Sequence, residues 1–245
     1  MTTDGRVAIV TGGGQGLGFA VAEALASGGV RLILTGRSQA KLDAAAARLD
    51  TDVLAVAGDA GERATAERTV AAALDRFGRA DILVNNAQTI FPQTPLIEQD
   101  DAMLEASIRS GLFGTIYFMQ AAYPALRESR GAIVNVGSMN GTAGIAGSAG
   151  YAAAKEGIRA VTRVAAREWG KDGIRVNVIC PGARTEPVIA FFEQQPELES
   201  VFLAQASLGR LAEPADVGRT VAWLSGPDCF LTGQTIHVDG GQIMP

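Results

Sequence analysis

A strand, a glycine-rich turn, a helix and a second strand follow one another within residues 7–35, and this unit limits the possible folds more than any other feature. Both strands are short and rich in β-branched residues, which is typical of parallel strands buried on both faces. The helix between them carries apolar residues at helical spacing and ends near Gly28-Gly29. Glycines at such a place let backbone N–H groups approach a phosphate at the positive end of the helix. The unit therefore predicts a parallel sheet that begins with a phosphate-binding turn.

The alternation of strand and helix continues along the chain. Further strands are expected at 53–57, 82–85, 132–136, 176–179 and 235–238, and helices at about 39–49, 62–77, 100–127 and 151–170. Such alternation argues for one parallel sheet covered on both faces. We expect an α/β fold with a single domain over residues 1–245, a doubly wound parallel sheet of about seven strands. The long connection at 183–210 is expected to be a loop over the substrate; for Phe191 and Phe192 the alternative is an extra helix packed on the core.

Charge and composition exclude several classes of partner. The net charge of −5 and the pI near 5.0 disfavour nucleic acid and anionic membranes, and no apolar run reaches the roughly 18 residues of a membrane span. Cys180 and Cys229 match no metal-ligand spacing and are expected to be reduced and structural. His237 stands alone, so we expect a structural histidine and no metal. The first strand begins near Arg6, without room for a targeting segment, which predicts a cytoplasmic protein.

Tyr151 and Lys155 lie one helical turn apart in an alanine-rich segment that follows the strand at 132–136. Residues at i and i+4 leave the same face of a helix. A phenol that exchanges a proton near neutral pH needs its pKa lowered from about 10, and a neighbouring ammonium favours the phenolate. Ser138, at the carboxyl end of the strand, can donate a hydrogen bond to a substrate oxygen. The alternative is an interfacial tyrosine beside a solvated lysine, but lysine is scarce in this chain, with three against eighteen arginines.

Several motifs stand in order along the whole chain: Thr11-Gly12-x-x-x-Gly16-x-Gly18, Asn85-Asn86-Ala87, Ser138, Tyr151-x-x-x-Lys155, Pro181-Gly182 and Val238-Asp239-Gly240-Gly241. With these motifs the chain resembles the short-chain dehydrogenase/reductase family, which has a Rossmann-type sheet. The resemblance implies a nicotinamide cofactor and a homodimer or homotetramer, paired through the Tyr151 helix and the helix that carries residues 113–119. It implies that Tyr151 is the acid/base, that Lys155 tunes its pKa and binds the ribose, and that Ser138 binds the substrate oxygen.

The resemblance also implies a set of cofactor-binding residues in addition to Tyr151 and Lys155. These are Gly12, Gln15, Gly16 and Leu17 at the diphosphate, Asp59 and Ala60 at the adenine, Asn86 and Ala87 at the ribose, and Pro181, Gly182 and Thr185 at the nicotinamide.

Three segments depart from the family pattern. Gln88 replaces the glycine that commonly follows Asn-Asn-Ala, and its side chain is expected to point toward the nicotinamide. Gly111 replaces the catalytic asparagine, which in the family helps to hold a water of a proton relay; Ser110, or a carbonyl freed by a local distortion, is the expected substitute. After Pro181-Gly182, Arg184 replaces an apolar residue and the threonine arrives one position early, as Thr185.

The end of the second strand decides between two cofactors. Enzymes that bind NAD(H) usually place an acidic residue there for the ribose 2′-hydroxyl, whereas this chain has Gly36 followed by Arg37. A guanidinium suits a 2′-phosphate, with Ser38 or Arg31 as further support, so NADP(H) is expected. NAD(H) is the alternative, because Gln15 puts no basic residue in the glycine turn.

These observations predict an oxidoreductase that moves a hydride between NADP(H) and a secondary alcohol or ketone. Two other classes stay open. A non-redox enzyme similar to halohydrin dehalogenases would replace the lysine and lose the glycine motif, which this chain keeps. A dinucleotide-sensing binding protein would not need Ser138, Tyr151 and Lys155, although Gly111 is compatible with it.

Overall fold

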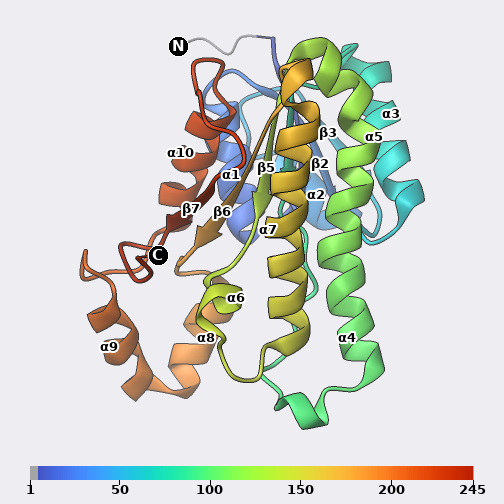
Figure 1. Ribbon diagram of the computed structural model, residues 1–245. Helices are drawn as coiled ribbons and strands as arrows, with labels where there is room; N and C mark the ends of the chain where they lie inside the picture. Colours follow the sequence, from blue (N-terminus) through green and yellow to red (C-terminus); the bar gives the residue numbers. More distant parts are fainter. Residues whose placement is uncertain (1–4, 245) are drawn as a thin grey trace.

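A seven-stranded parallel sheet forms the centre of the computed structural model, which describes residues 5–244 (Figure 1). The strands are β1 (Val7–Thr11), β2 (Arg31–Gly36), β3 (Val53–Ala57), β4 (Ile82–Asn85), β5 (Ala132–Val136), β6 (Arg175–Pro181) and β7 (Thr235–Val238). Their order is β3-β2-β1-β4-β5-β6-β7, and every neighbouring pair is parallel. The predicted fold class is confirmed. The order reverses direction between β1 and β4, and in such sheets ligands bind outside the carboxyl ends of the strands at this point.

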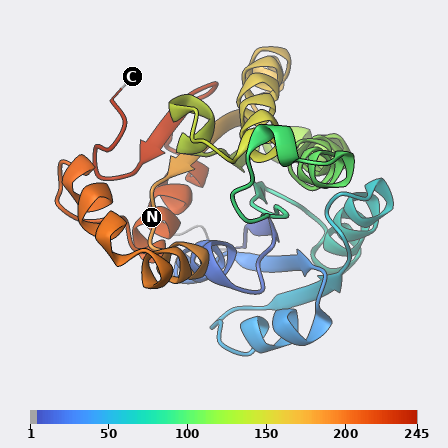
Figure 2. The same cartoon turned by 90° about the horizontal axis from the view of Figure 1, so that it is seen from below.

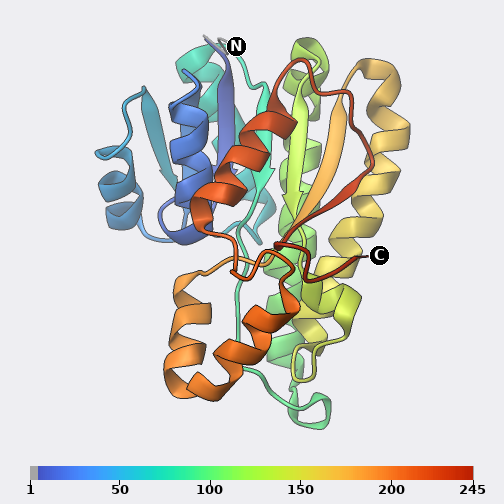
Figure 3. The same cartoon turned by 90° about the vertical axis from the view of Figure 1, so that its left-hand side faces the viewer.

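Helices cover both faces of the sheet (Figures 1 and 3). One face carries α1 (Gly16–Ala26), α2 (Gln39–Ala46) and α10 (Pro214–Ser225); the other carries α3 (Arg63–Phe77), α5 (Gly114–Ser129) and α7 (Ala149–Trp169). Shorter elements complete the chain: η1 (Leu96–Glu98), α4 (Asp101–Ile108), η2 (Arg109–Phe113), α6 (Met139–Ala143), η3 (Gly170–Asp172), α8 (Glu186–Gln194) and α9 (Pro196–Gln205).

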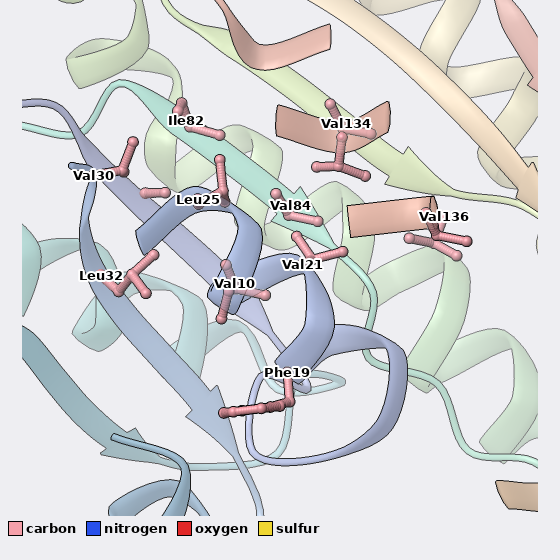
Figure 4. Close-up of a cluster of buried hydrophobic side chains, with 14 of the residues drawn as sticks. Val10, Phe19, Val21, Leu25, Val30, Leu32, Ile82, Val84, Val134 and Val136 are labelled. Carbon is pink, nitrogen blue, oxygen red and sulfur yellow. The ribbon is translucent and has the colours of Figure 1, made fainter. Parts of the chain in front are cut away.

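The core consists of two apolar layers separated by the sheet. Alternate residues of each strand point to opposite faces, so that Val10 of β1 joins one layer and Ile9 the other. Figure 4 shows Val21 and Leu25 of α1 in the first layer beside Val10. Full burial of each such side chain contributes about 1.5–3 kcal/mol. The continuous apolar strands of the sequence are explained by these two layers.

Two expectations about helices need correction. The long helical region predicted at about 100–127 is present and consists of α4, the π-helix η2 and α5. The subunit-contact face expected on residues 113–119 is smaller than predicted, because Phe118 and Met119 are buried in the core. The segment 183–210, expected as a loop with an extra helix as the alternative for Phe191 and Phe192, contains α8 and α9, and both phenylalanines lie in α8. The rings of Phe191, Phe192 and Phe202 pack together with centroids 5.5–6.2 Å apart, which joins the two helices as a separate apolar unit.

The carboxyl edge of the sheet is surrounded by α6, α8, α9 and the connection that follows β4, as Figure 2 shows from below. The glycine turn after β1 opens at the same edge. Far-apart parts of the sequence therefore meet at this edge. Within residues 5–244, no helix combines the length and the apolar character needed to cross a membrane.

Candidate active site

The turn between β1 and α1 is packed tightly against the end of β4. Gly12 has φ +67°, and a Cβ at this residue would lie 2.7 Å from Nδ2 of Asn86. Asn86 donates this amide to the carbonyl of Thr11 at 2.9 Å. The side chain of Asn86, expected at the ribose, therefore holds the glycine turn in place.

Thr11 is a residue of this site that the sequence analysis missed. Its buried hydroxyl accepts hydrogen bonds from the backbone N–H of Asn86 at 2.9 Å and of Ala87 at 3.0 Å. One side chain thus fixes the ends of β1 and β4 relative to each other, at the place where the strand order reverses. Its position at the head of the glycine motif is the feature of the sequence from which this role could have been predicted.

The start of α1 fits a dinucleotide diphosphate. Gly16, at the first residue of α1, has φ +53°, and a Cβ there would meet nothing within 4 Å, so the space outside this residue is open. Gln15 stands at the N-cap without a side-chain cap, and Leu17 packs against the core behind it. An exposed helix start of this kind attracts anions through its free N–H groups and its dipole.

A lysine supplies the positive charge that the glycine motif lacks. Nζ of Lys41, in the first turns of α2, donates a hydrogen bond of 2.6 Å to Oε1 of Gln15. Ser38 caps the same helix and accepts from the backbone N–H of Lys41 at 3.4 Å. Arg37 is exposed directly before this cap. Two cations therefore border the glycine turn, of which sequence reasoning identified only Arg37.

Arg31, proposed above as further support at this place, lies elsewhere. It is the first residue of β2, at the amino edge, and its Nη2 donates to the carbonyl of Gly5 at 2.7 Å. Five residue steps of about 3.3 Å separate it from Gly36 at the carboxyl edge. This expectation was wrong because it ignored the length of the strand.

Ser138, Tyr151 and Lys155 converge at the carboxyl end of β5. Ser138 follows that strand as the N-cap of α6, and its side chain lies close enough to the Tyr151 hydroxyl to lower the pKa of that group. Nζ of Lys155 lies 5.4 Å from the centroid of the Tyr151 ring and donates to the carbonyl of Val136 at 2.8 Å. The Lys155 side chain is 2% exposed. The one-turn spacing thus brings both side chains to the same place, as the sequence predicts.

The protonation of this cluster differs from expectation. Burial raises the pKa of the Tyr151 hydroxyl, and the Ser138 side chain offsets this in part. Burial also lowers the pKa of Lys155 from 10.5 to about 8. The expected lowering of the tyrosine pKa by the lysine does not dominate, because the loss of hydration outweighs it and the ammonium is directed to a backbone carbonyl.

The other expected cofactor residues line the same edge. Asp59 follows β3 and accepts from the backbone N–H of Gly61 at 2.8 Å, and Ala60 beside it is buried. Pro181 ends β6, where the N–H of Gly182 donates to the carbonyl of Val238 at 3.0 Å. Thr185 is the N-cap of α8. Arg184 is exposed and lies 3.6 Å from Glu199 of α9, so it reaches the helices rather than the sheet.

Gln88 lies against the π-helix. Its Nε2 donates to the carbonyls of Thr89 and Ser107, both at 3.1 Å, and its Oε1 occupies the space next to Gly111. The Ser110 hydroxyl donates to the carbonyl of Ala106 at 2.6 Å and accepts from the N–H of Thr89 at 3.0 Å. Gln88 is therefore engaged with the helix, and the Ser110 oxygen is already used within the protein.

Metal binding has no support in the described part of the chain. Residues 5–244 contain no group of three or more His, Cys, Asp or Glu that could hold an ion. His237 lies within β7, and both cysteines are free and buried.

Comparison with known proteins identifies the family. A family model described as enoyl-(acyl carrier protein) reductase matches residues 12–242. The 12alpha-hydroxysteroid dehydrogenase of a Clostridium species is 41% identical, with 97% of this chain and 96% of that protein covered. The 3-oxoacyl-(acyl-carrier-protein) reductase FabG of Vibrio cholerae is 35% identical over the full length of both. The crystal structure of a short-chain dehydrogenase/reductase of the glucose/ribitol dehydrogenase type from Brucella melitensis has a TM-score of 0.93 and 33% identity, with 100% of both chains covered.

These relatives are dehydrogenases and reductases, which favours the oxidoreductase over the two alternative classes. The chain belongs to the short-chain dehydrogenase/reductase family, the NAD(P)-dependent oxidoreductases that act on alcohols and ketones.

Proposed function

We propose that this protein transfers a hydride between NADP(H) and a secondary alcohol or ketone, with Tyr151 as the acid/base. The observation that carries this proposal is the convergence of Ser138, Tyr151 and Lys155 at the carboxyl edge of the sheet, the edge at which the glycine turn also opens. The hydride chemistry is supplied by the nicotinamide when it is bound. The chain supplies orientation and a proton.

Each of the three side chains has a distinct task. In the reductive direction Tyr151 donates its phenolic proton to the substrate oxygen, and its raised pKa keeps that proton in place at neutral pH. Ser138, which lies next to the phenol, hydrogen-bonds the same substrate oxygen. Lys155, close to the ring face, stabilises the phenolate that remains.

Two cations support NADP(H) over NAD(H). Gly36 leaves no carboxylate at the end of β2, Arg37 is exposed next to it, and Lys41 reaches Gln15 from α2. A 2′-phosphate between these side chains would receive a guanidinium and an ammonium, both of which favour a dianion.

The substrate we propose has a hydrophobic body. The helices α8 and α9 follow the nicotinamide end of the site, and their facing rings form an apolar unit. A panel suggested by the relatives comprises a 12-oxo steroid, levodione, diacetyl and a 3-oxoacyl thioester.

The test is turnover of this panel with NADPH, followed by loss of absorbance, for wild type and Tyr151→Phe. Loss of a general acid lowers kcat by about 10²–10⁴-fold, while removal of one hydroxyl leaves the fold intact. We expect this loss with an unchanged dissociation constant for NADPH. A Tyr151→Phe protein within about tenfold of wild type in kcat would contradict the proposed mechanism.

A further inference from the structure

Gln88 and Gly111 are 23 positions apart in the sequence and compete for one space. A Cβ placed on Gly111 would overlap Oε1 of Gln88 and would lie 3.0 Å from its Cδ and 3.1 Å from its Nε2. The contact involves the whole terminal amide, which is held in place by hydrogen bonds to the carbonyls of Thr89 and Ser107. A side chain at 111 and the present position of Gln88 therefore exclude each other.

The Gln88 amide joins two segments. Its Nε2 donates to the carbonyls of Thr89 and Ser107 and lies 3.4 Å from the Ser110 hydroxyl. The loop after β4 is thereby tied to the end of α4 and to η2. The π-helix η2 is an insertion in the helical ladder, a feature that occurs often at functional sites.

The segment held by Gln88 packs against the helix that carries Tyr151 and Lys155. Leu112 of η2 fills the space beside Gly157, and Leu104 of α4 lies beside Gly150. These two glycines flank the Tyr151–Lys155 turn of α7 on either side. A shift of α4 and η2 would therefore move the catalytic turn.

The second polar atom of Gln88, its Oε1, indicates that this residue is more than a structural brace. Its Oε1 is buried, and no hydrogen-bond donor in the described part of the chain reaches it. An unpaired buried acceptor opposes folding. Stability alone does not explain a glutamine here, since an apolar side chain of equal length would avoid that cost.

We propose that Gln88 is a positioning residue of the active site, which seats α4 and η2 against the Tyr151–Lys155 turn through the space that Gly111 leaves open. Part of this inference rests on the function proposed above, because its kinetic consequence requires Tyr151 to be the acid/base. The steric coupling between positions 88 and 111 does not depend on that function.

The coupling is tested by thermal unfolding without cofactor or substrate, for wild type, Gly111→Ala, Gln88→Ala and the double variant. Alanine is the better helix former, so in the Gln88→Ala background Gly111→Ala is expected to raise the melting temperature by about 2–4 °C. With Gln88 present, the overlap is expected to reverse the sign and lower the melting temperature. Equal effects of Gly111→Ala in both backgrounds would overturn the coupling.

Positioning is tested with Gln88→Met, which keeps the length and removes the amide. We expect kcat to fall at least tenfold, with the melting temperature within about 2 °C of wild type and the KM for NADPH within about twofold. Gln93→Met, the same change at an exposed residue of the same loop, is the control and is expected to behave as wild type. A Gln88→Met protein with kcat within twofold of wild type would overturn the positioning role. If Tyr151→Phe retained turnover while the unfolding coupling held, the proposed mechanism would fail and the coupling would stand.

Discussion

Lys155→Met is expected to change how the unfolding free energy depends on pH. The loss of a buried hydrogen bond usually lowers stability, whereas this variant is expected to be as stable as wild type or more stable at neutral pH. The lysine is almost fully buried, and burial lowers its pKa from 10.5 to about 8. A difference of this size corresponds to about 3 kcal/mol of unfavourable interaction for the charged form. Wild type carries this cost at neutral pH, where the Lys155 amine is protonated in both the folded and the unfolded chain.

The cost disappears as the pH rises. Between about pH 8 and 10.5 the unfolded lysine keeps a proton that the folded lysine has released. The unfolding free energy of wild type therefore rises through this window by about 3 kcal/mol relative to a variant that cannot titrate there. At neutral pH the variant gains about 3 kcal/mol from losing the charge and loses about 1–3 kcal/mol because the Val136 carbonyl loses its donor.

The assay is denaturant unfolding at several pH values from neutral to about 10, followed by tryptophan fluorescence. We expect Lys155→Met to be as stable as wild type or more stable at neutral pH, and to lose this advantage in alkali. Lys171→Met, at an exposed lysine in η3, is the control and is expected to run parallel to wild type. Parallel pH curves for wild type and Lys155→Met would refute the reasoning, because they would mean that the buried ammonium is not penalised.

Two further predictions concern the cofactor end of the site. Thr11→Val keeps the shape and leaves the N–H groups of Asn86 and Ala87 unpaired, so we expect a loss of about 1–3 kcal/mol in unfolding free energy and weaker binding of both cofactors; unchanged stability would contradict it. Arg37→Ala and Lys41→Ala are each expected to weaken NADPH binding about tenfold, by loss of about 1.4 kcal/mol, with little effect on NADH and with a smaller difference at high salt. Equal dissociation constants of wild type for the two cofactors would contradict the assignment of NADP(H).

The parts of this protein that were predictable depend on short-range pattern. Apolar β-branched runs fixed the seven strands, because a strand buried on both faces has few other solutions. The pairing of Tyr151 with Lys155 follows from helical spacing within a single element. Even Arg31 could have been placed correctly by counting residues along β2, since the strand separates it from the cofactor edge.

What escaped prediction depends on tertiary packing. The Lys41–Gln15 hydrogen bond joins residues 26 positions apart, and only the docking of α2 beside the glycine turn brings them together. The pKa of Tyr151 was expected to fall because a cation is close, yet it rises because the hydroxyl loses hydration within the protein. A sequence shows which charges are neighbours on a helix, but it does not show how much water surrounds them.

Gln88 and Gly111 illustrate the same limit with a different consequence. Taken singly, each departs from the family pattern: Gln88 was expected to point toward the nicotinamide, and Gly111 replaces the asparagine of the proton relay. In the structure the two residues are in contact, and the side chain of Gln88 occupies the space that Gly111 leaves open. The same edge also holds a buried ammonium at Lys155, which is unfavourable for folding. The unpaired Oε1 of Gln88 and the ammonium of Lys155 both oppose folding, and they lie where the loop after β4, η2 and α7 come together. Chemistry explains them better than stability does.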